Sequence, residues 1–540
     1  MGLVALLGLA GCGRSKHVVI GRDGQHAGGG VGGVPDELDV GGETGIGATP
    51  GAGGMATAGR GGSGGSGGAS GSGGRMGTGG SGAIAGTPNG GAASSMAGSG
   101  GVPPECEGAV TVEANQEVSV DAEPTQPIGR ITGDLVIHGS STDLGALRCL
   151  QSVDGSVHIV DATGLSHLNA LSRLASIGGD LSIEATALTG ISGLRSLTSY
   201  VDSLTIIGNE QLTSLDGLDG LPGVGPLTIE NNAVLRNIDG LSHVTGLVGD
   251  IQIDRNAELV NVDGLNGITM STGKVEIYEN RALVDVEGLA QMTDIPGEVA
   301  LDSNDSLASV AGLRGLTSVD YLAIGDNPTL RDLAGLENLT VARSISISSC
   351  DRLANIDALA GLTSLTNISL DNLPALSGFR GLRNLTSIEQ LSASGTWLTT
   401  FDGLDKLETI VSLSISSSGL KDLTGLENVQ VTGSVAFVDN AELESLSGLS
   451  VGGESFGNVV LRNNASLTAL TGLEGLTDIY TLSVEENPLL ASLASLDNLG
   501  AITGSAYFQD NPLLSTCDIR ALLERCEPFE STVSGNEPCN

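Results

Sequence analysis

The sequence predicts an all-β solenoid of about 17 coils, each 22–24 residues long, and three observations indicate this fold class. A phrase recurs, because Leu227–Leu241 reads LTIENNAVLRNIDGL and Ile251–Leu265 reads IQIDRNAELVNVDGL. Aligned on its first apolar pair, the phrase begins 17 times between Leu135 and Ala506, at intervals of 22–24 residues. Aromatic residues make up only 2% of the chain, so Leu, Ile, Val and Ala must build the core. So regular a period is typical of a solenoid.

Residues 1–12 come first and are predicted to be a lipoprotein signal peptide. The apolar run Gly2–Cys12 is too short to span a bilayer, and it ends in small residues as signal peptides do. Its end, Leu-Ala-Gly-Cys, resembles the bacterial lipobox, which implies lipidation of Cys12 and anchoring of the protein in a membrane. The alternative is an apolar N-terminus that is not cleaved.

Residues 13–105 follow and are predicted to be a disordered Gly/Ser-rich tether. Of these 93 residues 35 are Gly, so the segment buries too little apolar surface to offset the entropy of ordering it. Its positive and negative charges cancel as far as Pro103, so the formal net charge of −39 belongs to the remainder. Such a charge argues against a nucleic-acid partner, because phosphate would be repelled.

Each coil of the repeat reads roughly L-x-I-x-x-N-x-x-L-x-x-L-x-G-L. The first apolar residues alternate with polar ones, which predicts a strand with one buried face. We expect the Asn to bond its own turn and the backbone of the next coil, which satisfies amides that the bend leaves unpaired. This structural ladder comprises Asn209, Asn232, Asn256, Asn280, Asn304, Asn327, Asn440, Asn464, Asn487 and Asn511.

Two further local features of the repeat lead to structural expectations. In the middle of the array the ladder position is held by Cys350, Leu373, Thr396 and Ser418, and two intervals shorten to 22, so irregular coils are expected there. Asp-Gly pairs mark the next corner, where Gly is expected because it tolerates a positive φ. These pairs are Asp216-Gly217, Asp239-Gly240, Asp263-Gly264 and Asp402-Gly403.

The pattern G-x-L-x-I-x-x-N-x-x-L-x-x-L-x-G-L resembles the receptor L domain of insulin- and EGF-receptor ectodomains, and bacterial lipoproteins built from many such coils. The resemblance covers Gly133–Cys517 and implies a leucine-rich-repeat-like, right-handed parallel β-helix. We divide the body into an N-terminal cap at 106–134, a solenoid at 135–511 and a Cys-containing C-terminal cap at 512–540, with a short helix at Asp518–Arg525. The array is far longer than a receptor L domain, so ligand residues of the receptors do not carry over.

The cysteines fit an oxidising compartment. Cys106 and Cys149 flank the first coil and are expected to pair. Of the three C-terminal cysteines two are expected to pair, and Cys517 with Cys539 is the pair we favour. Cys350 occupies a ladder position and is predicted to be a buried free thiol.

No catalytic pattern in the sequence has the partners that it needs. Gly448–Gly452 reads GLSVG and matches a nucleophile elbow, but the last His of the chain is His243, so no downstream His completes a triad. The sequence therefore predicts that the protein is not an enzyme and has no cofactor or metal. A polysaccharide-acting enzyme is the least favoured alternative.

Outward residues of the repeated strand predict one long sheet face, about 80 Å in length at ~4.8 Å per coil. Four successive coils place Glu230, Asp254, Glu276, Tyr278 and Asp302 on it. This acidic stripe predicts a cationic partner or a bridging Ca²⁺; the alternative, which is the default for charged faces, is a solvated face that prevents aggregation. Trp397, the only Trp, either stacks on a ligand or, as we favour, fills a packing gap.

Together these features predict a membrane-anchored, surface-displayed recognition or adhesion lipoprotein of the bacterial cell envelope. The lipid at Cys12 would hold it in a membrane, at the outer membrane or cell surface, and a solenoid face would bind an unknown protein or glycan. The alternative is a structural spacer of the envelope, whose length is its function.

Overall fold

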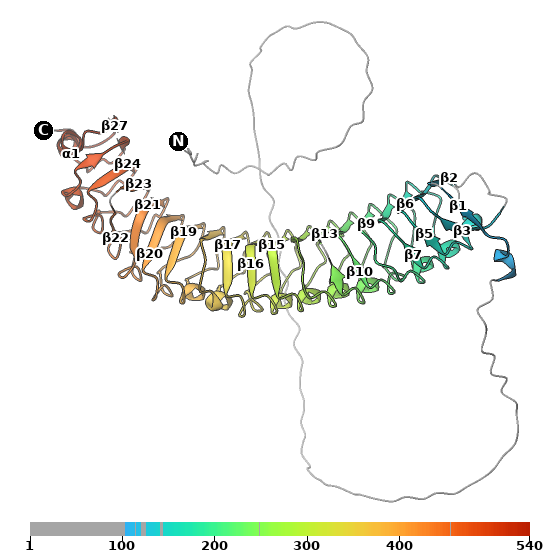
Figure 1. Cartoon of the computed structure of the whole chain (residues 1–540). Helices are drawn as coiled ribbons and strands as arrows, with labels where there is room; N and C mark the ends of the chain where they lie inside the picture. The colour runs from blue at the N-terminus through green and yellow to red at the C-terminus, as the bar shows by residue number, and fades with distance from the viewer. Residues whose placement is uncertain are drawn as a thin grey trace, which may run out of the picture. The chain divides into compact units, whose positions relative to one another are not determined.

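The computed structural model describes residues 103–539 except 114, 120–125, 141–143, 248 and 454. The predicted signal peptide with Cys12, and nearly all of the predicted tether, lie outside the described residues. Within the described residues the chain forms one long, curved stack of coils (Figure 1). No helix in this part of the chain is long and apolar enough to cross a membrane.

One parallel sheet runs along the stack, with its strands paired in chain order from β2 to β27 (Figure 1). Its strands are β2 (Gln116–Ser119), β4 (Leu135–His138), β6 (Val157–Val160), β8 (Leu181–Glu184), β9 (Leu204–Ile207), β11 (Leu227–Glu230), β13 (Ile251–Asp254), β14 (Val275–Tyr278), β15 (Asp294–Asp302), β16 (Ser318–Gly325), β17 (Val341–Ser348), β18 (Asn367–Asp371), β19 (Ser387–Ser394), β20 (Thr409–Ser416), β21 (Gln430–Val438), β23 (Phe456–Arg462), β24 (Asp478–Glu485), β26 (Ser505–Gln509) and β27 (Glu530–Ser534).

Shorter strands lie just before the main strands of several coils. They are β1 (Val110–Val112), β3 (Ile128–Ile131), β5 (Ser152–Val153), β7 (Ser176–Ile177), β10 (Gly223–Val224), β12 (Gly246–Leu247), β22 (Ser450–Val451) and β25 (Ala501–Ile502). Most pair parallel to one another, whereas β22 and β25 pair with the first residues of β21 and β24. One-turn 3₁₀ helices form many of the opposite corners, at Gly145–Leu147, Asn169–Leu171, Ser192–Leu194, Asp239–Leu241, Asp263–Leu265, Glu287–Leu289, Ala311–Leu313, Asp357–Gly361, Arg380–Leu382 and Ala494–Leu496, with one more at Pro104–Cys106. The predicted all-β solenoid is confirmed.

The repeat alignment gives the strand register directly. The first apolar residue of each repeat is the Cα partner of its counterpart in the next, from Leu135 with Val157 to Leu482 with Ala506. The sheet also continues past both predicted ends of the solenoid, because Leu135 pairs with Gln116 and Ala506 pairs with Ser531. Sequence reasoning missed these two strands because they lack the repeated apolar pair.

The core is a continuous column of aliphatic side chains. In the coil that begins at Leu227, the residues Leu227, Ile229, Leu235, Ile238 and Leu241 are each at most 1% exposed. Every coil covers its neighbours in the same way, so burial is shared between adjacent coils rather than concentrated in one centre.

Corner glycines have two different structural reasons. Gly217 and Gly403 have φ of 117° and 103°, as expected from the sequence. Gly240 does not have a positive φ. It must be Gly for another reason, because a Cβ there would lie 2.0 Å from the carbonyl oxygen of Leu215 in the preceding coil. Gly264 meets the carbonyl of Ile238 in the same way. For these two corners the positive-φ explanation was wrong, and close backbone approach requires the Gly.

The ladder asparagines are completely buried and bond between coils. Oδ1 of Asn232 accepts hydrogen bonds from the backbone N–H (3.1 Å) and Nδ2 (3.0 Å) of Asn209. Nδ2 of Asn232 donates to the carbonyl of Ile206 in the preceding coil (2.9 Å) and to Glu230 in its own (3.1 Å). The side chain therefore bonds the backbone of the preceding coil, whereas the sequence-based expectation was the backbone of the next one. It reaches the next coil through the side chain of Asn256, whose Oδ1 accepts from Nδ2 of Asn232 at 3.1 Å.

Three polar residues outside the predicted Asn ladder extend or end it. Ser418 was already placed at the ladder position from the sequence, whereas Thr186 and Asn536 were missed. The hydroxyls of Thr186 and Ser418 donate to the Oδ1 of the following ladder Asn, at 2.6 and 2.7 Å. Asn536 accepts from the backbone N–H of Asn511 at 3.2 Å. All three lie five residues after the first inward position of their strand, which is the signal that could have found Thr186 and Asn536.

The middle coils are regular, which corrects the expectation of irregular ones. Strand register is unbroken from β16 to β20. Cys350 fits the ladder position there because its sulfur accepts a hydrogen bond from the backbone N–H of Asn327. The thiol is free and buried, and burial raises its pKa to about 11.

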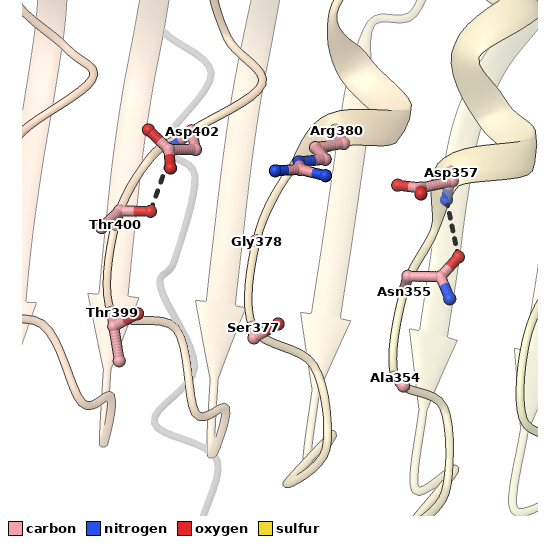
Figure 2. A pocket seen from close by; sticks show the side chains of 9 residues that line it. All are labelled: Ala354, Asn355, Asp357, Ser377, Gly378, Arg380, Thr399, Thr400 and Asp402. Carbon is pink, nitrogen blue, oxygen red and sulfur yellow. Dashed lines mark hydrogen bonds between the residues drawn. The ribbon is translucent and has the colours of Figure 1, made fainter.

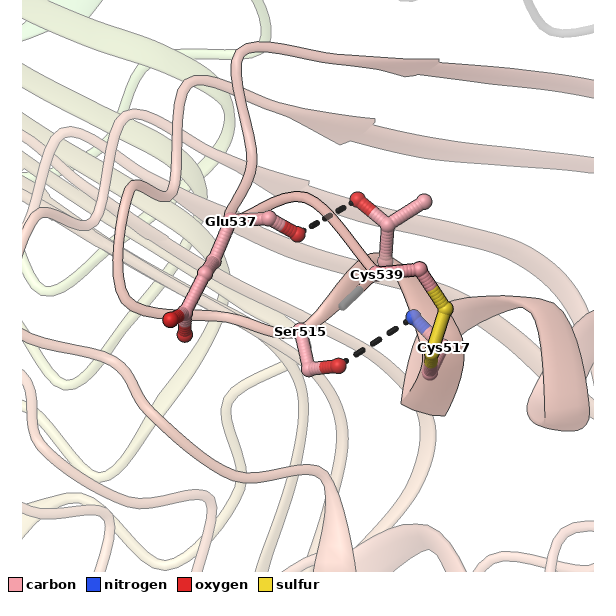
Figure 3. The surroundings of a disulfide bond; sticks show 5 residues. Ser515, Cys517, Glu537 and Cys539 are labelled. Atoms are coloured by element: carbon pink, nitrogen blue, oxygen red, sulfur yellow. Dashed lines mark hydrogen bonds between the residues drawn. A yellow bond between two sulfur atoms is a disulfide. The ribbon is translucent and has the colours of Figure 1, made fainter.

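Disulfides close both ends of the stack. Cys106 pairs with Cys149, and Cys517 pairs with Cys539 (Figure 3). The helix α1 (Thr516–Cys526) contains the predicted helical segment, and the Ser515 side chain caps it by accepting from the Cys517 N–H at 3.2 Å. Its apolar face, with Ile519 and Leu522, covers the last coil.

We expect Asn256→Ala to lower the free energy of unfolding by about 2–4 kcal/mol, because it leaves buried amides and carbonyls of two coils without partners. Urea unfolding followed by circular dichroism measures this loss. Asn266→Ala, an exposed change in the same coil, is the control. Equal unfolding midpoints for the two variants would contradict a structural role for the ladder.

Candidate functional site: an acidic stripe on the sheet

The structure brings the five predicted binding residues together on four adjacent strands. Glu230, Asp254, Tyr278 and Asp302 end β11, β13, β14 and β15 and are successive Cα partners across the sheet. Glu276 lies two residues before Tyr278, so it shares the outward face. We call these five residues the acidic stripe.

Two carboxylates of the stripe have basic partners. Glu230 forms an ion pair with Arg255, and it also accepts from Nδ2 of Asn231 at 2.8 Å. Oε2 of Glu276 lies 2.7 Å from Nζ of Lys274. Both cations are more than 40% exposed, so these pairs are surface ion pairs of small net stability.

Asp254 differs from Glu230 and Glu276, because it is only 3% exposed and forms no ion pair with a basic residue in the described part of the chain. Its Oδ2 accepts from Nε2 of Gln252 at 2.7 Å, whereas its Oδ1 is buried without a hydrogen-bond partner among the described residues. Burial raises the pKa of Asp254, and the Gln252 hydrogen bond only partly opposes the shift. A buried carboxylate oxygen without a partner is costly to the fold.

Charges of both signs surround Asp254: Arg255 lowers its pKa, whereas Glu230 and Glu276 raise it. Burial, followed by the charge of Glu276, raises the pKa of Glu298, and burial together with nearby carboxylates raises the pKa of Tyr278. Asp302 accepts a hydrogen bond from the Ser303 hydroxyl at 2.7 Å. Like charges opposite one another in a sheet are destabilising, so a cation placed here would relieve repulsion. Sequence reasoning missed Glu298, which lies one residue before the inward pair of its strand.

The bridging Ca²⁺ considered from the sequence has no ligand set in the described part of the chain. There, no three or more His, Cys, Asp or Glu side chains are grouped so that they could hold a metal ion. The stripe is therefore interpreted through its charge and its buried oxygen.

Trp397 does not fill a packing gap, as was favoured from the sequence. Its side chain is 71% exposed, whereas the next residue, Leu398, is completely buried. The packing interpretation was wrong because an apolar residue already occupies the inward position beside it.

No protein-family model matches the chain, and no curated relative matches it. Among solved structures, an internalin (InlF) from Listeria monocytogenes is similar, with 19% identity over 64% of this chain and 84% of that chain, and a TM-score of 0.41. InlJ from Listeria monocytogenes shares 17% identity over 67% and 75%, with a TM-score of 0.23. TLR13, solved in complex with ssRNA13, shares 14% over 76% and 84%, with a TM-score of 0.24. At these TM-scores the likenesses carry no functional weight.

We expect the contribution of Asp254 and Glu298 to the free energy of unfolding to rise as the pH falls toward the ordinary carboxyl range. The pKa values of Asp254 and Glu298 are raised in the folded state, so protonation of these two residues stabilises the fold. This stabilisation is complete below the ordinary carboxyl pKa range, and it is lost as the pH rises through the raised pKa values. Thermal unfolding across this range measures the trend. Asp254→Asn should remove its share of this rise, and a pH dependence that the variant leaves unchanged would contradict the prediction.

Proposed function

We propose that this protein is a recognition module that binds a basic protein through the acidic stripe. The observation that carries the proposal is the Oδ1 of Asp254, which is buried without a partner at the centre of a negative sheet face. Folding keeps a costly carboxylate buried there, whereas the carboxylates at the same strand position in neighbouring coils, Glu230 and Asp302, are partly exposed. Departures of this kind from optimal stability are expected at functional sites.

A basic side chain suits the stripe on geometric and electrostatic grounds. Lys or Arg would neutralise several carboxylates at once and supply hydrogen-bond donors, whereas an anion would meet additional repulsion. The stripe lies on a hydrogen-bonded sheet, so little ordering entropy is lost when a partner binds. We propose binding rather than catalysis, because the stripe holds no nucleophile beside a base.

The proposal includes the cellular setting expected from the sequence. A lipid at Cys12 would anchor the protein in a bacterial envelope membrane, at the outer membrane or cell surface, and residues 13–105 would hold the solenoid away from that membrane. A structural spacer would need the length of the stack but not the unpaired oxygen of Asp254, which favours recognition over the spacer alternative.

We expect the double variant Asp254→Asn with Glu276→Gln to weaken binding of lysine- and arginine-rich peptides of defined sequence by about tenfold or more. The control is Glu442→Gln with Glu444→Gln, which changes the net charge equally at exposed positions of another coil. Isothermal titration calorimetry on the full-length chain measures both affinities.

Equal weakening by the two double variants would show that only the overall charge attracts basic peptides, and the stripe would then have no specific role. Binding that resists the stripe variant altogether would place the partner elsewhere on the solenoid. Removal of Asp254's charge is expected to leave the fold intact, because Asn has the same shape and avoids the burial of a charge.

A further inference from the structure

A hollow of about 440 Å³ opens on another face of the solenoid, between three successive coils (Figure 2). It lies in the segments that lead from the ladder position into the 3₁₀ corners. Asn355 and Thr400 form its sides, Gly378 lies between them, and Arg380 lies between Asp357 and Asp402 along its edge (Figure 2).

The middle coil of the hollow lacks a side chain that many other coils have at the same place, and Gly190 is the corresponding residue of an earlier coil. Oδ1 of Asn355 accepts from the Asp357 N–H at 3.2 Å, and Oγ1 of Thr400 accepts from the Asp402 N–H at 3.4 Å. Gly378 holds the equivalent place between them and has no such group. The same contact two residues ahead is made by Asn237, Asn261, Asp285, Ser309, Asp332, Asp422, Ser445 and Ser492.

Gly378 is not required by the backbone. Its φ lies outside the left-handed range, and a Cβ there would have only the Asp402 carbonyl oxygen within 4 Å, at 3.8 Å. The fold would therefore accept Ser, as it does at the equivalent Ser309. Local structure gives no reason for the missing side chain, and the space that it leaves is the consequence to explain.

The groups around this space can both donate and accept hydrogen bonds. The two hydrogen bonds in Figure 2 join Asn355 to Asp357 and Thr400 to Asp402 through backbone N–H groups. The guanidinium of Arg380 can donate, and the carboxylates of Asp357 and Asp402 can accept. A ligand with neighbouring hydroxyls matches this combination, whereas an anion would meet two carboxylates and a cation would meet Arg380.

The exposed indole of Trp397 lies in the coil that forms one side of the hollow. Trp397 is two residues before Thr399, and Leu398 between them is completely buried. Thr399 itself lines the hollow. An exposed large aromatic side chain in the coil that forms one side of a polar recess points to a binding role.

We propose that the hollow at Gly378 and the indole of Trp397 form a binding site for a neutral oligosaccharide. The indole stacks on the apolar face of one sugar ring, and the groups around the hollow bond the hydroxyls of a neighbouring ring. This site is separate from the acidic stripe and does not depend on a basic protein partner.

Because Trp397 is the only Trp in the chain, intrinsic fluorescence excited at the indole reports on this site alone. The full-length protein is titrated with cellohexaose, chitohexaose and maltohexaose, and calorimetry measures the same affinities in the variants. We expect saturable quenching by at least one sugar, loss of about tenfold or more in affinity for Trp397→Ala, and a similar loss for Gly378→Ser, which places a side chain at the centre of the hollow.

Two matched variants separate this site from general effects. Arg380→Ala should weaken binding, whereas Arg383→Ala, which removes an exposed charge in the same coil, should not. The stripe variant Asp254→Asn with Glu276→Gln should bind the sugar normally. The proposal is overturned if no probe changes the fluorescence or gives heat at millimolar concentration, or if Gly378→Ser keeps the original affinity.

Discussion

The buried amide ladder is the constraint on which the rest of the structure depends. Each coil bends sharply after its main strand, and the bend leaves buried N–H and C=O groups that no strand pairs. Where an Asn holds the bend, it satisfies groups in two coils at once, as Asn256 does through the carbonyls of Ile229 (2.9 Å) and Asp254 (3.0 Å). The ladder thereby sets the spacing of the coils and holds the backbone of the costly stripe residue.

The same bonds make a strained backbone tolerable. The residue between the strand end and the ladder Asn has a positive φ, 56° at Asn231 and 53° at Arg255, although neither is Gly. Such a conformation costs about 1 kcal/mol or more and persists only where its surroundings fix it. Because stripe residues immediately precede these bends, their positions across neighbouring strands are fixed by the ladder rather than by their own contacts.

Much of this architecture could be predicted from the sequence, because period and inward apolar pairs are properties of single residues. The register from Leu135 to Ala506 follows from alignment alone. The end strands could not be predicted, since Gln116 and Ser531 replace the apolar signal there. Nor could the exposure of Trp397, which depends on the neighbouring inward position already being filled by Leu398.

Both candidate sites share one property that a regular array makes visible. In a solenoid each coil is a control for its neighbours, so a position that departs from its row without a local structural reason carries information. Asp254 is the buried carboxylate of a row in which Glu230 and Asp302 are partly exposed, and Gly378 lacks a side chain in a largely polar row. Neither departure improves packing or hydrogen bonding, and selection for stability alone would remove both. Their retention is therefore best explained by contacts that the folded chain makes with something other than itself.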